Sequence, residues 1–259
     1  MQPTPLSIIT RSGIITPHPL VIFLIIILSA FCIYLIHIDF CRFKALGPGG
    51  TPSTFPGYVK IKFLSLFAIS NPLEPAAIPP SLNPQSGYLK YISPRIGPRP
   101  AVEGIAPHRQ TTQRPPIHLF NLWSQMVYDL AQKHPQQLRL GTSCLEKHGP
   151  GLFTLSPSPS VIRRTGSRNC SGEICHSHPS DGSTHLTLHP ADAAIVLNAG
   201  WGERHPLAKG GWLSRFVPGG FLMVYAPRTA EELLVKKEIV KAAIWWVGGY
   251  DVESGESRF

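Results

Sequence analysis

The chain has 259 residues, of which only 15% are charged, well below the roughly 25% typical of soluble domains. Its 27 prolines exclude continuous helix or sheet over long stretches. The formal net charge is +9, and the first 116 residues hold ten Lys and Arg against three Asp and Glu. Because this excess lies beside an apolar segment rather than on a predicted folded domain, it favours a membrane lipid partner and no nucleic-acid partner.

Residues 1–19 are predicted to form an N-terminal tail, and residues 20–38 form an uncharged apolar run of bilayer-spanning length. A cleaved signal peptide is the alternative, but its apolar core should be shorter, and the small pair Ser29-Ala30 is followed by further apolar residues, which favours a retained signal anchor. Arg42 and Lys44 follow the run, whereas Arg11 precedes it. The positive-inside rule therefore predicts a single-pass protein of the endoplasmic reticulum membrane with a cytosolic C-terminal domain.

The chain has an odd number of cysteines, and their spacing gives neither a disulfide framework nor a complete zinc motif. We expect reduced thiols in a reducing compartment. The five are Cys32, Cys41, Cys144, Cys170 and Cys175.

Residues 39–116 are predicted to be a juxtamembrane and Pro-rich segment. Within it, residues 57–70 are apolar but too short to span a bilayer, so they either lie on the membrane surface or join the folded body. From Asn71 to Pro116 we expect a linker or irregular wrap.

Residues 117–250 are predicted to form one compact α+β domain, followed by a C-terminal tail at 251–259. Helical spacing predicts a helix from Ile117 that ends before Pro135. Two further helices are expected at 191–199 and 230–247, the last capped by Thr229. Strands are expected at 151–156, 184–188 and 220–226.

Five of the eleven histidines lie between residues 169 and 208. His176 and His178 share one face if they lie on a strand, and Glu173 joins them only if the chain bends or bulges there. The turn sequence Pro-Ser-Asp-Gly at 179–182 predicts a hairpin that returns the chain to His185. His205 follows in a tight polar turn, beside Glu203 and Arg204.

Two functional interpretations compete for these histidines. In one, two or three imidazoles and Glu173 bind a divalent metal ion. In the other, a neutral histidine removes a proton from a substrate hydroxyl without any metal. A third, non-functional interpretation is that the histidines make only structural hydrogen bonds. Arg204 also has two possible roles: it could bind a carboxylate or enolate oxygen of a ligand, or form an ion pair that fixes its own turn.

Several strings resemble the fungal luciferase domain. They are Glu173-Ile174-Cys175-His176-Ser177-His178, His185-Leu186-Thr187-Leu188, the specific Gly200-Trp201-Gly202-Glu203-Arg204-His205-Pro206-Leu207-Ala208, and Tyr225-Ala226-Pro227-Arg228. The resemblance extends from about residue 20 and is dense over 168–247. After Ala208 the chain departs from the luciferase pattern, and its turn before His185 is similar to that of non-luminous fungal relatives.

The resemblance implies O2-dependent oxidation of 3-hydroxyhispidin or another hispidin-like, enolisable aromatic, with no metal or other cofactor and with O2 as co-substrate. It implies base candidates His176, His178, His185 and His205, with Glu173 orienting one of them. Arg204 would hold the substrate oxygens, and Trp201, Trp212, Tyr225 and Arg228 would also contribute to binding.

Among the base candidates we expect His178 to dominate, because it should lie at a strand end open to substrate. The alternative to an oxygenase is a non-luminous relative that acts as a hydrolase or isomerase, or a small-molecule-binding protein. A zinc requirement would distinguish a hydrolase from an enzyme that oxidises an enolate without a metal.

Overall fold

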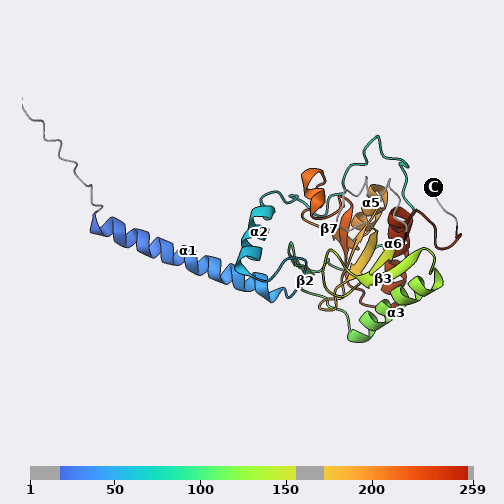
Figure 1. Cartoon of the computed structure of the whole chain (residues 1–259), viewed down its shortest axis with the longest axis horizontal. Helices are drawn as coiled ribbons and strands as arrows, with labels where there is room; N and C mark the ends of the chain where they lie inside the picture. Colours follow the sequence, from blue (N-terminus) through green and yellow to red (C-terminus); the bar gives the residue numbers. More distant parts are fainter. Residues whose placement is uncertain (1–17, 156–171, 256–259) are drawn as a thin grey trace, which may run out of the picture. The chain divides into compact units, whose positions relative to one another are not determined.

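The structure is a computed structural model that describes residues 18–155 and 172–255 (Figure 1). The chain divides into two units, Met1–Arg42 and Phe43–Phe259, and the second is called the folded body below. Each unit is described by itself.

The first unit contains most of helix α1, Pro19–Ala45. In the described part of the chain it is the one helix long and apolar enough to cross a membrane, judged by length and composition. It includes the whole predicted span of 20–38 and continues for seven residues beyond it. A helix whose apolar side chains point in every direction is typical of a segment buried in lipid or protein.

The folded body is built on a six-stranded sheet in the order β3-β4-β5-β6-β8-β7, in which every neighbouring pair is antiparallel. The strands are β3 (Leu138–Thr142), β4 (Pro150–Thr154), β5 (Glu173–Ser177), β6 (Thr184–Thr187), β7 (Gly202–Arg204) and β8 (Phe221–Val224). The three predicted strands correspond to β4, β6 and β8. Together with the helices, they confirm the α+β class.

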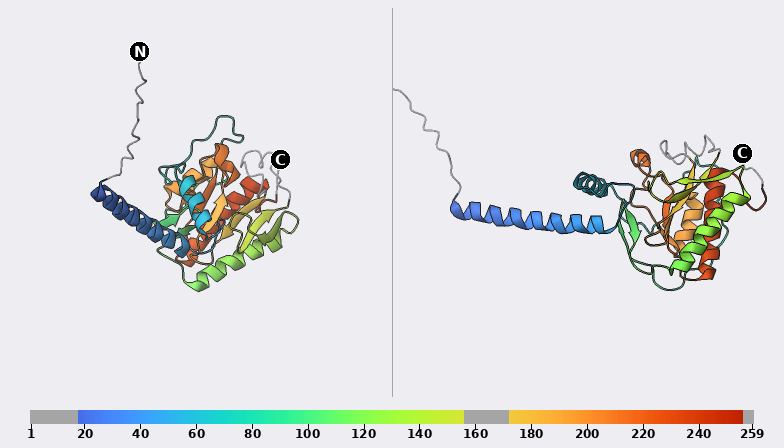
Figure 2. Two further views of the ribbon diagram at one scale, coloured as in Figure 1. Left: turned by 60° about the vertical axis from the view of Figure 1, so that its left-hand side comes forward. Right: turned by 60° about the horizontal axis from the view of Figure 1, so that its bottom comes forward.

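One face of the sheet is covered by helices. They are α3 (Ile117–Lys133), α5 (Pro190–Asn198) and α6 (Ala230–Gly248). Helix α6 packs against β4, β5 and β6, and α3 packs against both β3 and α6, as Figure 2 shows. Helix α6 begins where Thr229 accepts a hydrogen bond from the Glu232 N–H and ends at Gly249, which adopts φ 75°. These are the start and stop signals present in the sequence.

The segment before the sheet is more ordered than expected from its prolines. It contains α2 (Phe55–Ser65) and a short hairpin of β1 (Val102–Gly104) and β2 (His108–Gln110). The apolar stretch that begins at Gly57 forms most of α2 and lies within the folded body. A 3₁₀ helix, η1 (Gly211–Arg215), follows β7. The hairpin contributes His108 to the functional site described below.

Strands β5 and β6 form the predicted hairpin around residues 179–182 and divide their side chains between two faces. Ser177 accepts a hydrogen bond from the indole N–H of Trp123 in α3, so it faces the helices. His176, one residue earlier, therefore faces away from the helices. It lies directly opposite His185 in the strand register.

A β-bulge places Glu173 on the same face as His176. Two successive residues of β4 pair with Glu173 and Cys175, so Ile174 is an extra residue without its own partner in the register. An extra residue of this kind changes which face the preceding side chain occupies. The bulge on which the sequence prediction for Glu173 depended is therefore present.

Candidate functional site

Five buried histidines gather on the face of the sheet that the helices do not cover. They come from β2, from β5 and the turn after it, from β6, and from the segment after β7, and each is at most 3% exposed. Neighbouring ring centroids lie 4.7–5.6 Å apart. The five are His108, His176, His178, His185 and His205.

Glu173 and His176 form a tightly bonded pair. The Nδ1 atom of His176 lies 2.5 Å from Oε1 of Glu173, which also accepts a hydrogen bond from the Ser143 hydroxyl. The other carboxylate oxygen accepts the backbone N–H of Cys144. Burial opposes ionisation of Glu173, but the bonds from His176, Ser143 and Cys144 outweigh it and lower the pKa of this carboxyl group. An ionised Glu173 can only accept at this contact, so it favours the tautomer of His176 that carries its proton on Nδ1.

His178 and His185 are joined to a second carboxylate. The Ser183 hydroxyl donates to Oδ1 of Asp181, and Nδ1 of His178 lies 2.9 Å from the same hydroxyl oxygen. The Nε2 atom of His178 lies 3.1 Å from Nδ1 of His185. Burial lowers the pKa of His178 to about 4, so its imidazole is neutral near pH 7.

The chain of side chains continues through the Pro-rich segment. Nε2 of His185 lies 3.1 Å from Nδ1 of His108, and Nε2 of His108 lies 3.3 Å from Oε1 of Glu203. The Tyr225 hydroxyl donates to the other oxygen of Glu203. Three imidazoles thus link Asp181 at one end to Glu203 at the other.

His205 and His189 have structural hydrogen bonds at both ring nitrogens. His205 accepts the Leu207 N–H at Nδ1, and its Nε2 lies 2.8 Å from the carbonyl oxygen of Ile105. His189 caps α5 by accepting the Ala191 N–H at Nδ1, and its Nε2 contacts a backbone carbonyl. Neither ring has a free nitrogen for proton transfer in this arrangement.

A cavity of about 420 Å³ opens beside the cluster and is lined by His108, His176, His185, His205 and Glu146. Its volume is in the range of small-molecule sites. His178 does not line this cavity and is fully buried. The expectation that His178 lies at an open strand end was therefore wrong, because its ring is enclosed by Asp181, Ser183 and His185 of the same hairpin.

None of the predicted substrate-binding residues is among those that line this cavity. Arg204 donates to backbone carbonyls and lines a separate cavity of about 200 Å³. Trp201 is in the core, and Arg228 pairs with Glu232. Trp212 is 44% exposed and packs against the cavity-lining Phe216. Tyr225 donates to Glu203, which lies beside His108.

Sequence reasoning missed or did not assign several polar residues that bond to the histidines or to the carboxylates beside them. They come from the Pro-rich segment, from the loop between β3 and β4, and from the turn after β5. Short-range patterns could not group them, although Glu146 lies in a stretch that resembles the luciferase domain. They are His108, Arg109, Ser143, Glu146, Asp181 and Ser183.

The expectation of reduced thiols was wrong for one cysteine. Cys144, whose N–H bonds Glu173, is disulfide-bonded, and its partner lies outside the described residues. Cys32, Cys41 and Cys175 are free. Sequence spacing did not reveal this bond, because disulfide pairing depends on the fold.

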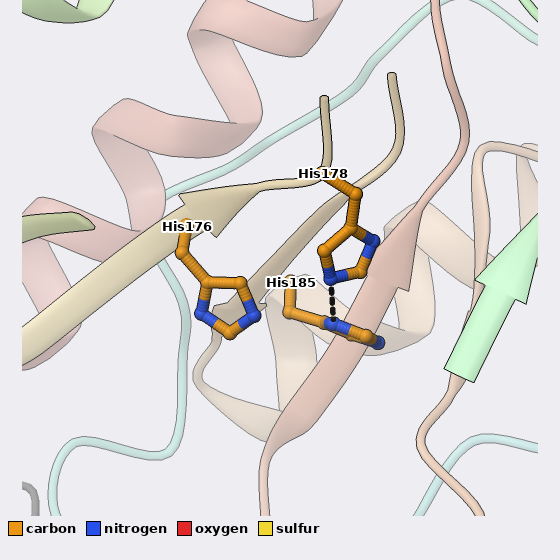
Figure 3. A group of neighbouring side chains, drawn as sticks. All are labelled: His176, His178 and His185. Carbon is orange, nitrogen blue, oxygen red and sulfur yellow. Dashed lines mark hydrogen bonds between the residues drawn. The ribbon is translucent and has the colours of Figure 1, made fainter. Parts of the chain in front are cut away.

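Figure 3 shows His176, His178 and His185 with their rings turned toward one another. One nitrogen from each of these residues lies within 4.8 Å of the others. With the cavity beside them, these features define an α+β protein with a buried polyhistidine cluster at a cavity wall.

Comparison with known proteins specifies this class further. A family model described as "Luciferase domain" matches residues 171–243. The chain is 32% identical to a luciferase of Armillaria mellea over 225 residues, which covers 81% of this chain and 80% of that protein. It is 31% identical to a luciferase of Neonothopanus nambi over 239 residues, with 86% and 85% coverage. The chain belongs to the fungal luciferase family; no solved structure matches it.

Proposed function

We propose that this protein catalyses the O2-dependent oxidation of an enolisable, hispidin-like aromatic, without an organic cofactor. Family membership supports luciferase-like chemistry, and the observation that carries the proposal is the buried Glu173–His176 pair at the cavity wall. An enolate can transfer an electron to O2 directly. The protein must therefore remove the substrate's acidic proton, orient the resulting anion and exclude water.

The pocket supplies an acceptor for that proton. Because Glu173 holds the proton of His176 on Nδ1, the unprotonated Nε2 is the atom available to accept a proton from a substrate hydroxyl. Among the cavity-lining histidines, His176 is the one bonded directly to a carboxylate whose pKa is lowered. This geometry favours His176 over His178 as the group nearest the substrate.

Three cationic side chains line the same cavity and favour an anionic substrate. Lys60, Lys147 and Arg215 are exposed at its wall. Their positive charge would stabilise a phenolate or enolate more than the neutral acid, which lowers the cost of deprotonation. The rings of Phe216 and Phe221 supply apolar surface for an aromatic body.

The test is to mix purified full-length protein with 3-hydroxyhispidin in air and record O2 uptake and light together. We expect O2 uptake above that of a sample carrying His176→Ala, with or without emitted light. Substrate conversion without O2 uptake would support the hydrolase or isomerase alternative instead. Tight binding without conversion would support a binding protein.

We also propose that α1 anchors the protein in the endoplasmic reticulum membrane. Its length and apolar composition support this, and full-length protein should then resist carbonate extraction. A truncation should remove residues 1–42 and retain Phe43, which is buried in the folded body against Tyr58. If full-length and truncated proteins are extracted equally, the anchor is excluded.

The side of the membrane on which the body lies is tested separately. The charges that flank α1 predict a cytosolic body, whereas the disulfide at Cys144 is typical of an oxidising lumen. Protease digestion of sealed microsomes decides between them, because a lumenal body is protected until detergent is added.

A further inference from the structure

The histidine cluster is held from its carboxylate ends. Each imidazole has two ring nitrogens, so a ring whose one nitrogen bonds an outer group can direct its other nitrogen toward the neighbouring rings.

From the first end, Ser183 and Asp181 hold the outer nitrogen of His178. The Ser183 hydroxyl donates to Oδ1 of Asp181, and Nδ1 of His178 lies 2.9 Å from the same hydroxyl oxygen. The other ring nitrogen of His178, Nε2, is directed toward His185.

From the second end, Glu203 and His108 hold the outer nitrogen of His185. Oε1 of Glu203 lies 3.3 Å from Nε2 of His108, and Nδ1 of His108 lies 3.1 Å from Nε2 of His185. The other ring nitrogen of His185, Nδ1, lies 3.1 Å from Nε2 of His178.

The third ring is His176. Its Nδ1 is bonded to Glu173, and no hydrogen bond to its Nε2 is present among the described residues. Figure 3 shows one nitrogen of His176 directed toward the other two rings, and one nitrogen from each of the three rings lies within 4.8 Å of the others. Three buried ring nitrogens that converge in this way provide a ligand set for a cation.

We propose that His176, His178 and His185 bind one divalent first-row transition-metal ion. The outer contacts of the three rings support this site. Each ring has its second nitrogen held by a carboxylate or by a group beside one, the outer arrangement typical of histidine metal ligands.

The separation of the His178 and His185 nitrogens fits such an ion. Two nitrogens at about 2.0–2.1 Å from a tetrahedral ion lie about 3.3 Å apart, close to the 3.1 Å between His178 and His185. Glu146 Oε2 lies 3.7 Å from Nε2 of His178 and could approach as a fourth ligand. Three histidines with a position open to a cavity are typical of catalytic rather than structural sites.

This inference departs from the metal-free expectation that the family resemblance carries, and it does not depend on the proposed substrate. With an ion bound, His176 acts as a ligand rather than as a free base. A substrate hydroxyl that reaches the ion would lose its proton more readily, because coordination lowers the pKa of a bound oxygen acid. The proposed oxidation would then begin from a metal-bound anion.

The test uses tag-free, full-length protein in detergent, dialysed against a chelator and then titrated with Co2+ while its visible absorption is recorded. We expect one Co2+ per chain, with d–d bands typical of nitrogen ligation, and displacement by Zn2+. The matched control is His118→Ala, an exposed histidine of α3, which should bind as the wild type does. His185→Ala should weaken binding at least 100-fold.

Because His185→Ala could also disturb folding, Glu203→Ala provides a second variant that keeps all three ligands. It removes the group that orients His108 and should weaken Co2+ binding about 10–100-fold. Wild-type protein that binds no stoichiometric Co2+, or His185→Ala protein that binds it as tightly, would overturn the proposal. Both results are independent of whether 3-hydroxyhispidin is oxidised.

Discussion

The two faces of the central sheet show how one set of strands serves two purposes. On the helix-covered face, β5, β6 and β8 present Cys175, Leu186 and Val224 to an apolar core. On the other face, the same strands present His176, His185 and Phe221 to the cavity. Alternation along a strand separates adjacent residues into an apolar core and a polar network. Substitutions at neighbouring positions should therefore have different consequences.

The largest expected effect is on catalysis from the cavity face. His176→Ala should lower turnover about 10²–10⁴-fold, whether this ring acts as a base or as a metal ligand. Cys175→Ala, one residue away on the helix-covered face, should keep turnover close to that of the wild type. The comparison is kcat for O2 uptake in the two purified variants, and equal losses in both would contradict the division between faces.

The second effect concerns stability on the helix-covered face. Leu186 is fully buried beside His185 in β6, and Leu186→Ala should reduce the free energy of unfolding by about 2–5 kcal/mol. The folded fraction should retain its KM, since the removed atoms do not line the cavity. Urea unfolding monitored by tryptophan fluorescence measures the change, and a raised KM at unchanged stability would argue against this assignment.

The third prediction uses the buried charge at the boundary between core and site. Lys236 of α6 donates to the carbonyl oxygen of Gly182 and lies 4.5 Å from the ring centroid of Trp123. Burial lowers its pKa to about 7. Between pH 7 and about 10.4, the unfolded chain therefore binds more protons than the folded protein, and the stability should rise with pH across this window.

Lys236→Met should remove that dependence. At pH 7 or below, the variant should be more stable by about 1–2 kcal/mol, because a buried cation is replaced by an apolar chain of similar length. The advantage should shrink as the pH approaches 10. Melting temperatures at pH 6.5, 8 and 9.5 provide the measurement; a constant difference between the two proteins would show that Lys236 does not titrate in this range.

The sequence contains local signals for much of this fold. Thr229 and the glycines after residue 247 delimit α6, and the turn at 179–182 indicates the β5–β6 hairpin. These signals act over a few residues, so a linear pattern contains them. The pairing of His176 with His185 follows from the turn and from strand alternation.

Other parts of the site depend on contacts that are distant in sequence. His108 lies 77 residues before its partner His185, in a segment whose prolines suggested a linker. The hydrogen bond that the Gln110 backbone N–H donates to the Asp181 carboxylate fixes that segment beside the hairpin. Strand β7 was expected as a turn, since three residues are too few to show a period. Tertiary packing, rather than local propensity, determines these elements.

The smallest expected effect tests a polar contact on the helix-covered face. The Trp123 indole N–H donates to the Ser177 hydroxyl over 2.7 Å, and that oxygen lies 2.8 Å from the Thr184 hydroxyl. Ser177→Ala leaves the buried N–H without this acceptor and should cost about 1 kcal/mol of stability. Turnover should be unchanged, because Ser177 points toward α3 although it lies between His176 and His178.

In a Trp123→Phe background there is no N–H to satisfy, so Ser177→Ala should cost less stability there. A double-mutant cycle in urea measures this coupling, which we expect to be about 0.5–1 kcal/mol. Equal costs in both backgrounds would show that the Trp123–Ser177 bond does not contribute to holding α3 on the sheet.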